Sequence, residues 1–144
     1  MVAGKTTFRS ASYALTMSDH SGTHVDSFKH FGPGGVSIDQ MPLEDFYTEG
    51  IALDLSHVAL RAAISVAEME KALKQSGQEI KQGDTVLIHM AFNKRVHFDD
   101  PRWQHDFPGL EPAAVHWLAD KGCKMFGMLT ASSMPCASCL ANRS

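Results

Sequence analysis

The chain has 144 residues, of which 44% are hydrophobic and 20% are charged, and its formal net charge is −3 at pH 7. This size suits one globular domain with a buried core, and the scattered basic residues in a slightly acidic chain argue against a nucleic-acid partner. Because no segment approaches the ~20 apolar residues of a membrane span and the N-terminus lacks the apolar core of a secretion signal, we expect a cytoplasmic protein with no membrane partner.

The first expected element covers residues 8–17. That stretch contains aromatic and β-branched side chains, and part of it alternates between apolar and polar residues. This pattern favours a strand. We expect that strand to run directly into the motif that follows it.

The motif that follows holds three histidines and an aspartate within eleven residues: His20, His24, Asp26 and His30. Their offsets are all even, so an extended chain would place them on one face, whereas a helix would scatter them. A straight strand would hold the first two imidazoles near the limit for sharing one ion, and Gly22 offers a bend. We therefore predict a kinked strand that enters a loop.

These residue types are ligands of divalent metal ions. Zinc and manganese bind imidazole nitrogen and carboxylate oxygen, and three protein ligands with an open position suit activation of water. The alternative is a set of ordinary surface or packed histidines near a turn. We favour the metal site because that alternative brings several imidazoles and a carboxylate to one face without a purpose.

The rest of the chain predicts mixed α and β structure. Ser65 and Glu68 form a capping box that starts a helix, which Gly77 ends, and Pro112 starts a second helix. The strand at 85–90 is continuously apolar, which indicates burial on both faces. The expected elements are strand 51–55, helix 65–77, strand 85–90, loop 91–107, helix 112–122 and strand 123–129.

Several other residues invite functional interpretations. Isolated histidines are typically surface or hydrogen-bonded groups; those here are His57, His89, His97, His105 and His116. His89 is the one to watch because it lies at the end of a predicted buried strand. The aromatic and basic loop 91–107 is either a pocket wall or lid, or a solvated loop pinned by its aromatic rings.

The three cysteines do not make a disulfide framework. Cys123 lies in an apolar stretch that is typical of a buried strand. Cys136 and Cys139 form a single C-x-x-C pair without a second pair or a nearby histidine, which is weak support for zinc. We interpret residues 1–129 as one domain and residues 130–144 as a divergent, flexible tail.

The histidine motif resembles the signature of the cyclase-like metal hydrolases, which include kynurenine formamidases and isatin hydrolases. The resemblance rests on His-x-Gly-Thr-His-x-Asp at 20–26, followed by His-Phe at 30–31, and covers roughly residues 20–127. Further matching segments are 35–55, 83–88 and 107–110 with the helix after it.

The resemblance implies a function, a set of ligands and a fold. It makes His20, His24 and Asp26 the ligands of a zinc or manganese ion and His30 the proton-transferring residue. The implied reaction is hydrolysis of a small-molecule substrate, an aryl formamide or a lactam, by metal-activated water. The implied fold is a swivelling β/β/α-type domain with mixed sheets or a partial barrel flanked by helices.

The chain also departs from the family pattern. Family members are longer at both ends, and the formamidase branch has a further His and Glu near its C-terminus that complete a two-metal centre. Where the family reads Gly-Ile-Asp-Thr-Pro-Ser, residues 127–132 read Gly-Met-Leu-Thr-Ala-Ser. We therefore expect a truncated, incomplete fold, a homo-oligomer, most simply a dimer, and weak activity. The alternative is a vestigial member that binds metal or self-associates without turnover.

Overall fold

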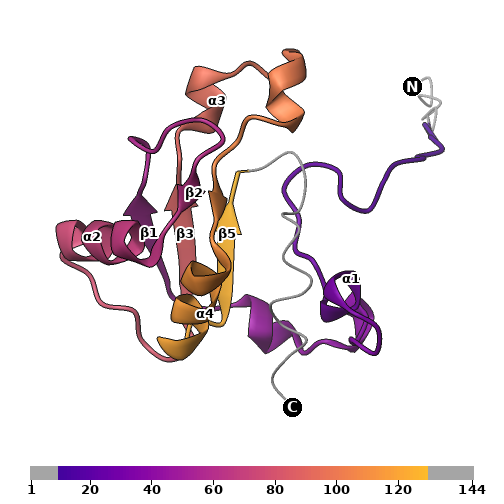
Figure 1. Ribbon diagram of the computed structural model, residues 1–144. Helices are drawn as coiled ribbons and strands as arrows, with labels where there is room; N and C mark the ends of the chain where they lie inside the picture. The colour runs from indigo at the N-terminus through magenta and orange to yellow at the C-terminus, as the bar shows by residue number, and fades with distance from the viewer. Residues whose placement is uncertain (1–9, 130–144) are drawn as a thin grey trace, which may run out of the picture.

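The computed structural model describes residues 10–129, in which helices and short parallel sheets form a mixed α/β fold (Figure 1). Three strands form a parallel sheet in the order β1-β3-β5, and β2 pairs with β4 in a second, two-stranded parallel sheet. The strands are β1 (Gly50–Asp54), β2 (Ala63–Ile64), β3 (Thr85–His89), β4 (Gly109–Leu110) and β5 (Met125–Met128). Neither sheet closes into a barrel within these residues. The predicted mixed α/β class is confirmed.

The helices differ widely in length. The two long ones are α2 (Val66–Ser76) and α4 (Pro112–Asp120), and the single-turn ones are α1 (Phe28–Phe31) and α3 (Phe92–Arg95). Three 3₁₀ turns complete the described elements: η1 (Ile38–Gln40), η2 (Leu43–Phe46) and η3 (Pro101–Gln104).

The ends of α2 follow from local chemistry. The Ser65 side chain accepts a hydrogen bond from the backbone N–H of Glu68, which satisfies one of the unpaired donors of the first turn. Gly77 ends the helix with φ +66°, a left-handed conformation that costs glycine little. Pro112 is the first residue of α4, a position where the fixed φ of proline suits a helix and its missing N–H costs no hydrogen bond. Both helices were therefore predictable from sequence.

The hydrophobic core lies between the three-stranded sheet and the two long helices. Leu53, Val86 and Ile88 point from the sheet into a cluster to which α2 contributes Met69 and α4 contributes Leu118; these five side chains are at most 4% exposed. Full burial of side chains of this size contributes roughly 1.5–3 kcal/mol each. This layer holds the sheet together from one side only.

The opposite face of the sheet is open. Leu87 is 51% exposed and Phe126 is 43% exposed, although both lie on strands of the parallel sheet. The expectation that the strand at 85–90 is buried on both faces is therefore wrong for the described residues. The two long helices, α2 and α4, pack on the same face of the sheet. They therefore bury one face of this apolar strand and leave the other face exposed.

The N-terminal part lies apart from this layered core. Figure 1 shows the segment that carries α1 beyond the β5 side of the sheet, away from α2 and α4. The strand expected at 8–17 is wrong where it is described, because residues 10–17 form no strand and are exposed. Tyr13 is 89% exposed and Leu15 is 84% exposed. An alternating pattern is not enough for a strand, which also needs a partner strand and a core to pack on, and residues 10–129 provide neither for this segment.

A guanidinium braces the loops at the carboxyl end of β3. The Arg95 Nη1 atom donates to the Val58 carbonyl at 2.6 Å and Nη2 donates to the Met90 carbonyl at 2.8 Å. Arg95 Nε is buried and has no partner among the described residues. One side chain therefore ties the segment after β1 to the end of β3.

Two expectations concern residues at the ends of the chain. The proposed flexible tail at 130–144, with its C-x-x-C pair, and the first residues of the predicted N-terminal strand lie outside the described residues. Within residues 10–129, none of the helices has the length and apolar character needed to cross a membrane.

Candidate metal centre

The histidine motif folds as turns and one helical turn, and the predicted kinked strand is wrong. The Ser21 N–H donates to the Ser18 carbonyl in a turn, Gly22 has φ +71°, and His30 lies on α1. The predicted bend at Gly22 is present. The chain bends more than expected because this segment has no neighbouring strand to pair with among residues 10–129, so turns satisfy its backbone instead.

Three predicted site residues nevertheless converge. The Nδ1 atom of His20 lies 2.9 Å from Oδ1 of Asp26, and Nε2 of His24 lies 3.3 Å from the same oxygen. The two nitrogens are 3.1 Å from each other. Four ligands placed tetrahedrally at ~2.0–2.1 Å from zinc are ~3.3 Å apart, so these three spacings are close to those of one coordination sphere.

The backbone of the turn orients one of these rings. The Nδ1 atom of His24 lies 2.8 Å from the carbonyl oxygen of Gly22. Since a carbonyl only accepts hydrogen bonds, this contact places a proton on Nδ1, and in the neutral ring Nε2, which faces Asp26, then carries the lone pair. Metal-binding histidines are commonly held in this way by a hydrogen bond at the second nitrogen.

Asp26 supplies the test of whether the residues fit a cation. Its side chain is 21% exposed, and Oδ1 is buried without a hydrogen-bond partner among the described residues, although two ring nitrogens lie near it. A buried carboxylate oxygen without a donor is costly. A divalent ion among these atoms would neutralise the carboxylate and accept its lone pair. The donor set therefore fits a divalent cation.

His30 joins the same cluster from α1. Its ring centroid lies 4.2 Å from that of His20. The ligand-type atoms of His20, Asp26 and His30 all lie within 4.8 Å of one another, which is looser than the first triad. The cluster thus contains two overlapping triads that share His20 and Asp26. Within residues 10–129, the structure contains no other group of this kind.

The position of α1 is set by a close backbone approach. The Lys29 N–H donates to the Val36 carbonyl at 3.1 Å. A Cβ atom on Gly35 would lie 2.4 Å from the Phe28 carbonyl carbon, so only glycine allows the returning chain to pass there. These contacts fix the helical turn that carries His30.

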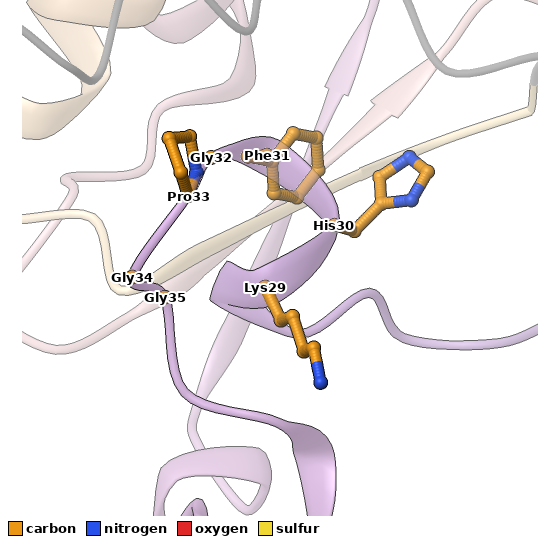
Figure 2. A pocket seen from close by; sticks show the side chains of 7 residues that line it. All are labelled: Lys29, His30, Phe31, Gly32, Pro33, Gly34 and Gly35. Atoms are coloured by element: carbon orange, nitrogen blue, oxygen red, sulfur yellow. The ribbon is translucent and has the colours of Figure 1, made fainter.

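Two hollows adjoin the cluster. One, of about 370 Å³, is lined by His20, Asp26 and His30 together with Asp19, Val25, Ser27, Lys29 and Ile38. The other, of about 630 Å³, runs along Lys29 to Gly35 and is open to solvent (Figure 2). Lys29 and Asp19 carry no sequence signal of their own beyond adjacency to the motif. Both hollows adjoin His30, and the smaller one also adjoins His20 and Asp26.

The remaining histidines are dispersed. His57 Nε2 lies 2.7 Å from Glu68 Oε2, and this hydrogen bond lowers the pKa of the Glu68 carboxyl. His89 is exposed at the end of β3, where it is the register partner of Asp54 on β1. The pKa of Asp54 is lowered chiefly by hydrogen bonds from Ser56 and less by the charges of His89 and His57. These groups form an electrostatic cluster at the carboxyl edge of the sheet.

Aromatic rings pack against one another within the loop at 91–107. Phe92 is fully buried, and its ring centroid lies 5.1 Å from that of Trp103 and 6.2 Å from that of Phe107. Phe98 is 67% exposed. The interpretation of a loop pinned by aromatics describes its local packing, while its role as a pocket wall stays a prediction.

Comparisons with known proteins point to one family. A sequence model of a family described as putative cyclase matches residues 3–133. The chain is 30% identical over 113 residues to a kynurenine formamidase of Erythrobacter litoralis, an alignment that covers 78% of this chain and 46% of that protein. The chain spans about half the length of the curated relatives it matches.

Solved structures show the same relationship. Isatin hydrolase A from Labrenzia aggregata, bound to benzyl benzoate, superposes with a TM-score of 0.66 at 25% identity, over 80% of this chain and 49% of that one. A protein described as a potential metal-dependent hydrolase with cyclase activity superposes with a TM-score of 0.62 at 26% identity, over 87% and 59% of the two chains.

Proposed function

Because this chain belongs to the putative cyclase family, we propose that it is a metal-dependent hydrolase of a non-peptide amide, either an aryl formamide or a cyclic amide. The observation that carries the proposal is the convergence of His20, His24 and Asp26 on one point, with His30 beside them. The names of the relatives support the substrate class, since they are a formamidase and an isatin hydrolase.

His20, His24 and Asp26 would hold one divalent ion, zinc or manganese. Such an ion supplies Lewis-acid chemistry, which polarises a carbonyl and lowers the pKa of water toward ~7. The chain itself positions the lone pairs, through the hydrogen bond from His24 to the Gly22 carbonyl, and admits substrate through the adjoining hollows.

His30 would move the proton. Histidine is a common general acid and base, and its imidazole can take a proton from the attacking water. It then returns the proton to the leaving nitrogen as the carbonyl carbon–nitrogen bond breaks. The place of His30 on α1, beside His20 and at the rim of both hollows, suits this role.

The deciding experiment measures metal content and turnover together. The protein is purified without added metal and analysed by elemental mass spectrometry, and it is then assayed on formanilide and isatin before and after chelation. We expect about one zinc or manganese per chain and hydrolysis that chelation abolishes. A metal-bound protein without turnover would select the alternative, a family member that binds metal without catalysis. Protein without bound metal would overturn both.

We also propose that the chain forms a homodimer. The open face of the sheet exposes Leu87 and Phe126, and parallel sheets are ordinarily covered on both faces. Light scattering of the parent chain, of Leu87→Gln and of Leu43→Gln tests this, since Leu43 is 82% exposed but lies on the 3₁₀ turn η2 and not on a strand. We expect only Leu87→Gln to weaken the dimer. A monomeric parent chain would contradict the proposal.

A further inference from the structure

Lys29 lies between the two hollows beside the histidine cluster. Lys29 and His30 are the two residues that line both hollows. Figure 2 shows their side chains extending from α1 away from Gly34 and Gly35. Since the Lys29 N–H is bonded to the Val36 carbonyl, its backbone is anchored. A flexible four-carbon stem therefore carries an ammonium from a fixed point next to the group proposed to transfer the proton.

The charges around Lys29 leave this ammonium available. It is the one lysine or arginine that lines either hollow, and among residues 10–129 it forms no ion pair. Asp39 is nearby, and its pKa is lowered chiefly by a hydrogen bond from Ser37 and only slightly by the charge of Lys29. The acidic Asp26 faces the imidazoles of His20 and His24.

We propose that Lys29 selects substrates that carry a carboxylate near the scissile amide. This inference rests on the proposed function, and it names the substrate class of the same site. A substrate whose amide carbonyl approaches the histidine cluster through the smaller hollow places its neighbouring substituents along α1. A carboxylate there would pair with the ammonium, whereas an uncharged substituent would gain nothing from it.

Substrate preference provides the kinetic test. The metal-loaded protein is assayed on formanilide and on formanilide with an ortho carboxylate, and the ratio of the two kcat/KM values is compared among variants. Because an exposed ion pair contributes up to about 1 kcal/mol, we expect Lys29→Gln to reduce the preference for the acidic amide by about 5-fold. Lys29→Arg should retain most of the preference. Lys94→Gln, on α3, is the matched control and should leave it unchanged.

A binding measurement separates this inference from the proposed function. Calorimetry with benzoate and benzamide on the metal-loaded protein needs no turnover, so it tests Lys29 even if neither amide is hydrolysed. We expect benzoate to bind more tightly than benzamide, with an advantage that Lys29→Gln reduces about 5-fold and added salt weakens. Equal benzoate affinity in the parent and Lys29→Gln, or no preference for benzoate in the parent, would overturn the inference.

Discussion

The carbonyl oxygen of Gly22 lies 2.8 Å from Nδ1 of His24, so a backbone group determines which imidazole nitrogen faces Asp26. That carbonyl points at the ring because Gly22 has φ +71°, a conformation that side-chain-bearing residues rarely adopt. The glycine of the motif thus acts on the chemistry of the site through the tautomer of its neighbour.

Gly22→Ala should weaken metal binding without a steric clash. A Cβ atom there meets no atom within 4 Å, so the cost is backbone strain of about 1–2 kcal/mol, which rotation of the turn would relieve by moving the carbonyl away from His24. Zinc titration by calorimetry measures the effect. Gly77→Ala, with φ +66° and similarly open surroundings, is the control and should lower stability while leaving zinc affinity unchanged.

Asp26→Asn should reduce zinc or manganese affinity by roughly 100-fold or more, because the loss of a direct ligand exceeds the 10–100-fold cost of losing a supporting group. The change keeps the shape of the side chain and removes its negative charge. Metal affinity is measured by competition with a chelating dye. Unchanged affinity in this variant would remove Asp26 from the ligand set.

His30→Ala and His24→Ala together decide between the two triads. If His30 transfers protons, its loss should leave the metal bound and lower the amidase rate by ~10²–10⁴-fold. His24→Ala should lose the metal. Metal analysis of both purified variants gives the answer: the reverse pattern, with metal lost only in His30→Ala, would make His30 the ligand and leave His24 outside the coordination sphere.

The parts of the fold that sequence predicted are those with local causes. The capping serine and terminal glycine of α2 act within a few residues, so its bounds were predictable, and the apolar runs at 51–55 and 85–90 correctly indicated strands. The exposure of Leu87 depends on which face the two long helices cover, and no local pattern encodes that.

The candidate site likewise has features that were predictable from the sequence and features that were not. Residue chemistry was enough to predict that His20, His24 and Asp26 converge, because one glycine allows a short chain to bring them together. Their backbone was not predictable from the even spacing, since a turn followed by a helical turn also gathers them. The neighbour Lys29 carries no motif signal and emerges only from the shape of the hollows.

Arg95→Met should destabilise the fold by roughly 1–3 kcal/mol, because it leaves two backbone carbonyls without their charged donor while keeping an apolar stem. Urea unfolding followed by circular dichroism measures the change. Lys94→Met, at the neighbouring exposed position on α3, should have an effect within about 0.5 kcal/mol. Equal stabilities of the two variants would show that the brace does not matter.

Acid should weaken the turn at η3 because it protonates the Asp100 carboxylate. Hydrogen bonds from the side chain and backbone of Arg102 lower the pKa of Asp100 from 3.8 to about 2. Since the folded pKa is the lower one, the ionised carboxylate stabilises the fold above pH 3.8, and this contribution is lost as pH falls toward 2. Asp100→Asn should therefore show a shallower loss of urea resistance over that interval. An identical acid slope would contradict the prediction.

The register of the sheet also bears on how this chain reaches its fold. β3 is central, and each of its parallel partners, β1 and β5, is joined to it by a long crossover that contains a helix. None of the described strands pairs with its neighbour through a short hairpin, so loop-closure entropy opposes each of these pairings before side-chain packing can compensate for it. We therefore expect slow folding in which α2 and α4 form before the sheet. Until β5 docks, one edge of β3 stays unpaired, and that interval is when chains are most prone to aggregate.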